Sequence, residues 1–392
     1  MNRRDFIIGC AALLIFKNRL DDAVSLIEKA TTVGWFGTEP NISAAALKVK
    51  QGPFVLSRRF GEAKQADTVF WLASTSKTMI ATGIMLLSDH GILSLSDRVQ
   101  KYLPEFTRDG RDEVLIRNLL THTTGLPELL PQELQLLASH APLEDFVRAT
   151  CRTPLLFKPG TRVSYSNLGV LLATEIAERI LHRPYRDFLR KELFEPLQMM
   201  DTYLGLGRYK VEETARNQRG TLAFDPNNPY YRDLGAPWGG IHSTVSDVTK
   251  FLDVFLDPDR GLLRKPTAEA MVKNQTVGLN EPWGLGWMLA QSHDFDVREW
   301  RSIHRLPGLW SKFDAVTHGA FGKRCSPLTF GHYGVSGTLA WADPATRVTC
   351  VLLTTKRVGF SRDGILGPVS DLVAEAFDES DVPAAPYLRP TG

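Results

Sequence analysis

The spacing of apolar residues near the N-terminus predicts a helix followed by a β-hairpin. Apolar residues recur at the three- and four-residue spacing of an amphipathic helix at Leu20, Ala23, Val24, Ile27 and Ala30. Further along the chain, residues 42–50 and 54–60 are two stretches of strand length on either side of a Gln51-Gly52-Pro53 turn. We expect these two stretches to pair as a hairpin.

The C-terminal part of the chain predicts a second hairpin and a last helix. Residues 338–343 and 347–354 are predicted strands joined by an Asp343-Pro344-Ala345-Thr346 turn, and residues 365–377 are a predicted helix. The chain between residues 91 and 239 is rich in helical patterns and loops. The two hairpins are expected to contribute to one antiparallel sheet with helices on its faces.

A serine and a lysine, Ser74 and Lys77, stand at the start of a mostly apolar helical stretch. Residues three apart lie on one face of a helix, so these two side chains can touch. Gly91 follows where a left-handed C-cap would end the helix. Ser74 is therefore expected in the first turn, where unpaired backbone N–H groups favour negative charge, as a serine nucleophile requires. Taken alone, the pair also fits an N-cap serine with a solvent-facing lysine.

Two further segments carry candidate chemistry. Tyr165-Ser166-Asn167 follows a turn and precedes an apolar helical stripe, so it is either a set of functional side chains or an ordinary N-cap with a packed aromatic ring. Residues 331–337 hold three glycines at the start of a predicted strand, which indicates a close approach of the backbone to a ligand or a bulged edge strand.

Together these segments resemble the serine β-lactamase and penicillin-binding-protein superfamily. The resemblance is to the branch with class C β-lactamases, D-alanyl-D-alanine carboxypeptidases and family VIII carboxylesterases. Its three motifs are S-x-x-K, Tyr-x-Asn and His-x-Gly, matched by Ser74 to Lys77, Tyr165 to Asn167 and His332 to Gly334. Further landmarks of that superfamily match residues 119–127, 195–199, 239–244 and 283–287. In order and spacing the resemblance covers roughly Leu20 to Phe377.

The resemblance implies an α/β (α+β) fold with two domains. An antiparallel sheet flanked by helices would be formed by residues 20–90 and 240–392, and residues 91–239 would be an inserted, mostly helical domain. The active site would lie in the cleft between the two domains, a common position for ligands.

A base for Ser74 requires side chains whose pKa values are shifted from their ordinary values. Neither a lysine nor a tyrosine with an ordinary pKa serves as a base at neutral pH. Burial of Lys77 favours the amine, and an ammonium beside Tyr165 favours the phenolate, so we assign the base role to the two residues jointly. The resemblance implies that Tyr165 is the proton shuttle and Lys77 its electrostatic partner. It also implies an oxyanion hole formed by the backbone N–H groups of Ser74 and Val335.

The remaining expected site residues bear on the substrate. Asn167 would orient the acyl amide of the substrate or Lys77, and His332, Tyr333 and Gly334 would line the substrate site. Many relatives have a small hydroxyl residue where Tyr333 stands, and class C β-lactamases have a lysine where His332 stands. Both differences weaken the recognition of a substrate carboxylate.

We therefore expect a serine hydrolase that cleaves small-molecule esters or amides through a covalent acyl-enzyme, with carboxylesterase activity favoured. Alternatives are a D-Ala-D-Ala carboxypeptidase or weak β-lactamase that accepts a β-lactam, an acyl transferase on the same scaffold, and a non-catalytic penicillin-recognising sensor. Residues 291–327 carry Trp300, Trp310, Phe313 and Phe321. This stretch is expected either to roof the substrate pocket with aromatic surface or to be a surface loop that packs on its own aromatics.

Composition is that of an ordinary globular enzyme and suggests no cofactor. The 392 residues have a net charge of +2, which offers no electrostatic basis for binding nucleic acid. The sequence has no metal-ligand spacing, and its four cysteines lie far apart and are expected to be free thiols. His122 is interpreted as a hydrogen-bonding residue that holds a loop. Oligomeric state is left open.

The first 19 residues resemble an export signal. Arg3 and Arg4 form a twin-arginine pattern ahead of a short apolar segment from Phe6 to Phe16. Eleven apolar residues are too few to span a bilayer. Export to the periplasm is the favoured expectation, and a cytoplasmic enzyme with an apolar N-terminal helix is the alternative.

Overall fold

The computed structural model describes residues 3–32, 41–218, 224–290, 321–356 and 364–378, with side chains from Phe16 onward. Its main sheet has six antiparallel strands in the order β2-β1-β9-β8-β7-β6. These strands are β1 (Ala44–Gln51), β2 (Phe54–Gly61), β6 (Met288–Leu289), β7 (Phe330–Gly334), β8 (Thr338–Asp343) and β9 (Val348–Thr354). The N-terminal and C-terminal hairpins meet where β1 pairs with β9, with Ala46 opposite Leu353. The predicted antiparallel sheet is confirmed.

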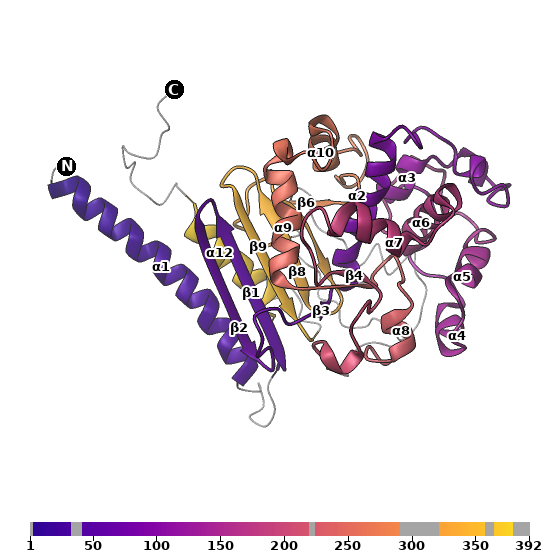
Figure 1. Cartoon of the computed structure of the whole chain (residues 1–392). Coiled ribbons are helices and arrows are strands. Elements are labelled where there is room, and N and C mark those ends of the chain that lie inside the picture. Colours follow the sequence, from indigo (N-terminus) through magenta and orange to yellow (C-terminus); the bar gives the residue numbers. More distant parts are fainter. Residues whose placement is uncertain (1–2, 33–40, 219–223, 291–320, 357–363, 379–392) are drawn as a thin grey trace.

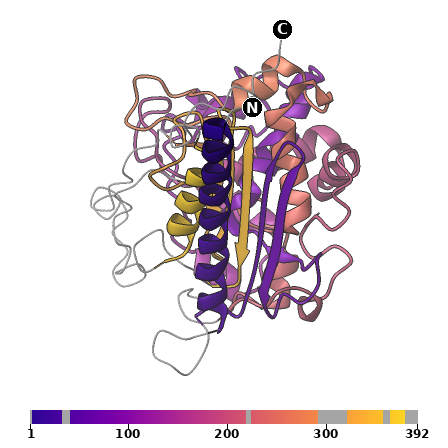
Figure 2. The same ribbon diagram turned by 90° about the vertical axis from the view of Figure 1, so that its left-hand side faces the viewer.

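Helices cover both faces of this sheet, because both faces of its inner strands β8 and β9 are buried and largely apolar. All residues of β9 are buried, and they alternate between two hydrophobic clusters. Val351 and Leu353 pack in the cluster that contains α9 (Val245–Leu256), whereas Cys350 and Leu352 pack in the cluster that contains α1 (Arg3–Thr32) and α12 (Leu366–Ala376). Figures 1 and 2 show α1 and α12 side by side on one face and α9 on the other.

The N-terminal helix runs past residue 19 without a break. α1 continues from the predicted export segment into the predicted amphipathic helix, whose Ala23 and Ile27 are fully buried. An ion pair of 3.2 Å between Arg19 and Glu375 joins α1 to α12. Within the described part of the chain, no helix has the length and apolarity needed to cross a membrane. Export remains a prediction.

The central part of the chain forms helices on the far side of α9 (Figure 1). Apart from α9, the helices between the hairpins are α2 (Ser76–Asp89), α3 (Ile116–Leu120), α4 (Glu133–Ala138), α5 (Leu143–Thr150), α6 (Asn167–Leu181), α7 (Tyr185–Leu189), α8 (Pro229–Asp233) and α10 (Lys265–Met271). α2 and α6 are the two longest of these, and they pack against each other in the larger hydrophobic cluster. This packing places the S-x-x-K and Tyr-x-Asn segments next to one another.

A second, three-stranded sheet was not predicted from the sequence. It has the order β3-β5-β4 and consists of β3 (Phe70–Trp71), β4 (Tyr203–Leu204) and β5 (Ile241–Ser243). Strands of two or three residues are too short to show a periodic pattern. The sheet matters for the site, because β3 leads directly into Ser74 and β5 follows the segment that contacts Lys77.

Candidate active site

Ser74 lies in a single 3-10 turn, Ala73–Thr75, which leads directly into α2. Every residue of α2 from Ser76 to Leu87 is buried, so the helix is a central core element and not an amphipathic surface helix. It ends where the sequence predicts, since Gly91 has a φ of +71° and its N–H donates to the Ser88 carbonyl at 3.0 Å. The serine is thus held at the N-terminal end of a rigid, buried helix.

The backbone immediately before Ser74 has a conformation that is rare for residues other than glycine. Ala73 has a φ of +48°. Such a conformation persists only where the surroundings hold it, and it is frequent at functional sites. Here the Ser76 hydroxyl accepts the N–H of Ile241 at 3.0 Å, and the indole N–H of Trp71 donates to the Gly239 carbonyl at 2.5 Å. The segment 239–241 therefore holds the turn from both sides.

Lys77 contacts Ser74, as the three-residue spacing predicted. Its Nζ donates to the Ser74 Oγ at 3.1 Å and to the Trp238 carbonyl at 2.5 Å. The side chain is buried, and burial lowers the pKa of Lys77 to about 7, although the charges of Glu128 and Glu133 act to raise it. A substantial fraction of Lys77 is therefore the neutral amine at neutral pH.

Tyr165 lies beside this pair. The Lys77 Nζ is 4.9 Å from the centroid of the Tyr165 ring. Burial raises the pKa of Tyr165 well above its ordinary value, while a hydrogen bond with the side chain of Ser74 acts to lower it. Burial thus acts on Lys77 and Tyr165 in the same sense, because it favours the uncharged form of each: an amine and a phenol.

The N-cap interpretation of the Tyr165-Ser166-Asn167 segment is confirmed. Ser166 is the N-cap of α6, and its Oγ accepts the Gly169 N–H at 3.4 Å and donates to the Pro127 carbonyl at 2.7 Å. This cap fixes the backbone on either side of Ser166, with Tyr165 beside Ser74 and Lys77 and Asn167 in the first turn of α6. An ordinary N-cap thus positions these two candidate residues.

His122 has the structural role that the sequence suggested. Its Nδ1 accepts the backbone N–H of Ser166 at 3.1 Å, and its ring lies 4.7 Å from that of Tyr165 and 4.8 Å from that of Trp283, centroid to centroid. Burial lowers the pKa of His122 well below its ordinary value, and the charge of Lys77 adds to this effect. The imidazole is therefore neutral and holds the Tyr165 loop in place.

The segment of the third motif packs against the backbone that leads into Ser74. Thr338 Oγ1 donates to the Leu72 carbonyl at 2.7 Å, and Ser336 Oγ donates to the Trp71 carbonyl at 2.9 Å. Between these anchors, the Gly337 N–H donates to the Gly334 carbonyl at 2.9 Å and closes the turn between β7 and β8 that contains Val335. The structure therefore brings the Val335 segment and the Ser74 segment together, as the expected oxyanion hole requires.

His332 and Asn167 complete the set of predicted residues. The His332 ring lies 6.0 Å from the Tyr165 ring and 6.2 Å from the Trp283 ring, and burial lowers the pKa of His332 to about 3. The backbone N–H of Asn167 donates to the Glu128 carbonyl at 3.1 Å. Tyr333 is half-buried beside His332, with a distance of 6.0 Å between their rings.

Sequence reasoning missed three contributors to the site. The Trp238 carbonyl, Glu128 and Glu133 act on Lys77, but none belongs to a recognised motif. For Trp238 and Glu128 the only signal was a position next to a matched landmark, since Trp238 precedes residues 239–244 and Glu128 follows residues 119–127. Glu133 had no such signal. A carbonyl group carries no sequence signature, and the burial of a carboxylate depends on the fold.

Of the four aromatic residues expected to roof the pocket, only Phe321 lies within the described residues. Trp300, Trp310 and Phe313 lie outside the described residues. Phe321 is fully buried in the hydrophobic cluster with Val369 and Val373 of α12. Phe321 is thus a core residue and does not roof a pocket.

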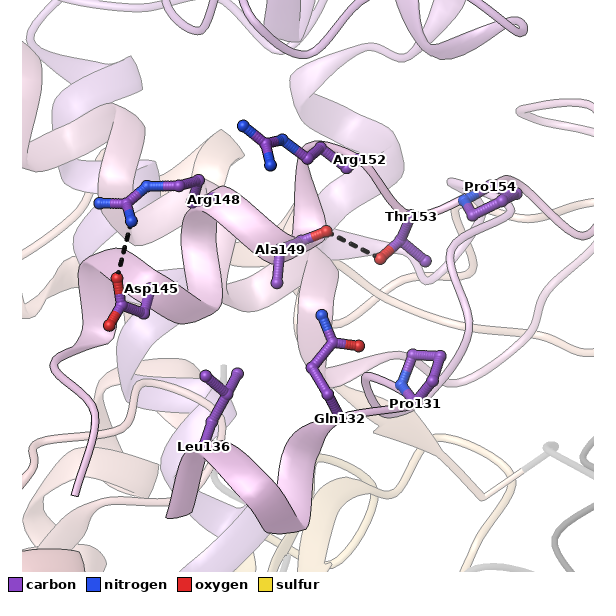
Figure 3. Close-up of a pocket in the computed structure, with 9 residues that line it drawn as sticks. All are labelled: Pro131, Gln132, Leu136, Asp145, Arg148, Ala149, Arg152, Thr153 and Pro154. Carbon is purple, nitrogen blue, oxygen red and sulfur yellow. Dashed lines mark hydrogen bonds and ion pairs between the residues drawn. The ribbon is translucent and has the colours of Figure 1, made fainter. Parts of the chain in front are cut away.

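No metal site is found in the described part of the chain, where no three His, Cys, Asp or Glu residues are grouped to hold an ion. Cys151, Cys325 and Cys350 are free thiols, as predicted. A separate surface hollow lies between α4 and α5 (Figure 3), and an ion pair of 3.0 Å between Arg148 and Asp145 stands at its edge. It contains none of the catalytic candidates.

The sequence matches the Beta-lactamase family over residues 38–374. The chain therefore belongs to this family, and the resemblance expected from the three motifs is confirmed. Its homologues in the β-lactamase and penicillin-binding-protein superfamily are hydrolases, and the protein is an enzyme of this serine hydrolase superfamily.

Two relatives with similar sequences are a penicillin-binding protein and a carboxypeptidase/endopeptidase. Penicillin-binding protein 4* of Bacillus subtilis (strain 168) is 28% identical over 65% of this chain, and the match spans 61% of that protein, which is less than two thirds of its length. The D-alanyl-D-alanine-carboxypeptidase/endopeptidase of Escherichia coli (strain K12) is 28% identical over 62% of this chain and 68% of its own.

Two solved structures have the same fold. EstCE1, a hydrolase with promiscuous acyltransferase activity, has a TM-score of 0.70 at 18% identity and covers 92% of this chain and 99% of its own. A family VIII carboxylesterase has a TM-score of 0.68 at 17% identity and covers 92% of this chain and 96% of its own. The predicted β-lactamase/transpeptidase-like fold is confirmed by these likenesses.

Proposed function

We propose that the protein is a carboxylesterase that cleaves its substrate through an acyl-enzyme on Ser74. The observation that carries this proposal is the contact of 3.1 Å between the Lys77 Nζ and the Ser74 Oγ, made by a lysine whose pKa is lowered to about 7. A neutral amine within hydrogen-bond reach of a serine hydroxyl is a competent general base.

In the acylation step, the Ser74 Oγ attacks the carbonyl carbon of the ester, and the hydroxyl proton passes to the Lys77–Tyr165 pair. The pKa directions favour the Lys77 amine as the acceptor of this proton, with Tyr165 as a phenol that can donate to the leaving alcohol. This division differs from the one that the family resemblance implied, in which Tyr165 shuttles the proton. In deacylation, water takes the place of the alcohol and the same groups act in reverse.

The negative charge of the tetrahedral intermediate would be held by the backbone N–H groups of Ser74 and Val335. Their segments are joined through the hydrogen bonds of Ser336 and Thr338 to residues 71 and 72. A preorganised donor of this kind contributes about 3–4 kcal/mol to the stability of the transition state.

Esters are preferred over β-lactams and peptides in this proposal. Substrates with a carboxylate need a cation or hydroxyl groups to bind it, but His332 is neutral and Tyr333 occupies the place of a small hydroxyl residue. Esters also need less protonation of the leaving group than amides do. The carboxylesterase with the same fold adds support.

Two other functions are each favoured by one comparison. The likeness to a D-alanyl-D-alanine-carboxypeptidase/endopeptidase favours peptide cleavage or weak β-lactam turnover. The likeness to EstCE1 favours transfer of the acyl group to an alcohol or amine. A non-catalytic sensor is disfavoured, because the contact between Lys77 and Ser74 is intact.

The test compares p-nitrophenyl acetate and butyrate with nitrocefin and a D-Ala-D-Ala peptide, with and without an added alcohol. The expected result is the highest kcat/KM for the two esters and an acyl adduct on a peptide that contains Ser74. Ser74→Ala should lose the ester hydrolysis and the acyl adduct. Ser88→Ala, a control at the other end of α2, should retain the hydrolysis and the adduct. Turnover by Ser74→Ala would contradict the acyl-enzyme, and a higher kcat/KM for nitrocefin or the peptide would contradict the esterase. Diversion of most product to the added alcohol would identify a transferase.

A further inference from the structure

Arg232 of α8 is a buried cation, and it is only 1% exposed. Its Nε donates to the Pro226 carbonyl at 2.7 Å, and its Nη2 donates to the Ala215 carbonyl at 3.2 Å. The Nη2 also lies 3.0 and 3.1 Å from the side-chain oxygens of Asn217 and Asn227. All four acceptors are neutral oxygen atoms. Burial lowers the pKa of Arg232 to about 10, so the guanidinium remains charged at neutral pH.

A buried charge that is bonded to neutral oxygen atoms is costly to the fold. Buried charges are usually paired with an opposite charge, and an apolar side chain of similar volume is often at least as stable in such a place. In addition, among the described residues the Nη1 of Arg232 has no hydrogen-bond partner, although the atom is buried. Stability alone is therefore a weak reason for an arginine at this position, and its contacts indicate what it holds in place.

One contact of Arg232 leads to the segment of Ser74. The guanidinium carbon lies over the Trp71 ring, 5.6 Å from its centroid, and Trp71 is 2% exposed. Trp71 ends β3, three residues before Ser74. Its indole N–H donates to the Gly239 carbonyl, and its own carbonyl accepts the Ser336 hydroxyl. The guanidinium therefore fixes an aromatic ring whose backbone runs directly into the nucleophile turn.

A second contact of Arg232 leads to the segment of Val335. Asn217 accepts a hydrogen bond from Arg232 with its side-chain oxygen. With its Nδ2 it donates to the Thr355 carbonyl at 3.1 Å and to the Ser336 carbonyl at 3.5 Å. Ser336 directly follows Val335, which carries the second proposed oxyanion donor. One buried guanidinium thus reaches both halves of the proposed oxyanion hole, each through a single intermediate residue.

We propose that Arg232 is a positioning residue that sets the spacing between the backbone N–H groups of Ser74 and Val335. The inference rests on the proposed function, because this spacing matters only if the two N–H groups stabilise an oxyanion. A lysine would keep the charge, but it has no planar fork of N–H groups with which to hold Asn217 and lie over Trp71 at the same time. A displacement of about 1 Å caused far from the reacting atoms can lower a rate about 10²-fold.

The test compares Arg232→Lys, which keeps the charge but not the fork, with Arg232→Met, which removes both. Each should lower kcat for p-nitrophenyl butyrate at least about tenfold and leave KM within about twofold of the wild type. An equal fall in kcat and kcat/KM is expected, because the oxyanion is present in the transition state and not in the bound ester.

Inhibition by phenylboronic acid gives a readout that a merely structural residue would not change. The Ser74 Oγ forms a bond to the boron, the hydroxyl proton passes to the Lys77–Tyr165 pair, and one oxygen of the tetrahedral adduct takes the place of the oxyanion. The Ki in both variants should rise by about the factor by which kcat/KM falls. A smaller amount of folded enzyme would lower the apparent kcat but would leave Ki unchanged.

Arg111 provides the matched control. It is also a buried arginine, 7% exposed, and its guanidinium donates to the Thr107 and Thr153 carbonyls at 2.9 and 3.0 Å. It also pairs with Asp109 at 3.0 Å. These three residues lie outside the segments that carry the site. Arg111→Lys should therefore leave kcat, KM and the boronate Ki as in the wild type, whatever its effect on Tm.

Asn217→Ala tests the second contact by itself. It removes the link from Arg232 to Ser336 and Thr355 and leaves the contact with Trp71 in place. The boronate Ki should rise and kcat should fall together, by a smaller factor than in Arg232→Met. If the Arg232 variants do not fold, this variant decides, and an unchanged Ki in Asn217→Ala would overturn the proposal.

The remaining outcomes separate the two proposals. Wild-type kcat and Ki in Arg232→Lys would overturn the positioning role and leave the esterase intact. Equal changes of Ki in Arg232→Lys and Arg111→Lys would also overturn it. If the wild type hydrolyses no ester and binds no boronate, the proposed function fails, and the role of Arg232 falls with it.

Discussion

Gly334 lies so close to Leu72 that a methyl group on its Cα would clash with the Leu72 carbonyl oxygen and with the Thr338 hydroxyl. The last glycine of the His-x-Gly motif is thus required by the close approach of β7 to the turn that carries Ser74. No ligand is needed to explain it. The glycine allows the strand and the turn that carries Ser74 to approach each other closely, as the proposed oxyanion hole requires.

Replacing Gly334 should therefore damage catalysis more than folding. Gly334→Ala is expected to lower kcat/KM for p-nitrophenyl butyrate at least about 10²-fold, the loss typical of a displaced oxyanion donor. Gly331→Ala is the matched control, because its methyl group would clash with the Ala340 carbonyl in the same strand pair and not with the nucleophile turn. Similar losses of activity in the two variants, in step with Tm, would argue against a specific role for Gly334.

The activity should rise with pH through neutrality. If the Lys77 amine accepts the Ser74 proton, kcat/KM for an ester increases as Lys77 loses its proton, with a midpoint at about pH 7. The carboxylate of Glu128 raises the pKa of Lys77, so Glu128→Gln should move the midpoint to lower pH. A rate that falls as pH rises through 7 would mean that Lys77 acts as the ammonium and that another group is the base.

Burial of Lys77 should cost stability. The unfolded chain binds a proton at Lys77 up to the ordinary pKa of 10.5, whereas the folded protein releases it at about 7. The fold is therefore destabilised most at and below pH 7, and this cost is lost as pH rises from 7 to 10.5. Lys77→Met should be more stable than the wild type at pH 7 by about 1–2 kcal/mol, after loss of the lysine's hydrogen bonds.

Urea unfolding at pH 7 and pH 9.5 measures this difference, which should shrink at the higher pH. Ser74→Ala is a suitable reference, since it removes the activity but leaves the buried amine in place. A Lys77→Met protein that is less stable than the wild type at pH 7 would show that the hydrogen bonds to Ser74 and Trp238 outweigh the cost of burial.

Lys77 and Tyr165 should act as one unit. Lys77→Ala and Tyr165→Phe are each expected to lower kcat at least about 10²-fold, the usual loss when acid–base help is removed. The double variant should lose far less than the product of the two, because either change disables the same proton transfer. Losses that multiply cleanly would instead show that the two groups work independently.

Local relationships in this protein were predictable from the sequence alone. The spacing of Ser74 and Lys77 predicted their contact, because helix geometry places residues three apart on one face. The hairpins, the end of α2 at Gly91 and the helix after Tyr165 likewise follow from patterns of a few neighbouring residues. The motifs, read together with their order, also predicted the fold.

The pKa values and long-range hydrogen bonds of these residues were decided by the tertiary structure. The pKa of Lys77 depends on its burial and on Glu128 and Glu133, and its second hydrogen bond goes to Trp238, 161 residues away. The protonation of His332 depends on its burial, which lowers its pKa, and on the Tyr333 carbonyl, whose oxygen lies 2.7 Å from the His332 Nδ1. Desolvation and the orientation of backbone groups arise only when distant segments pack together, and no local pattern of residues encodes them.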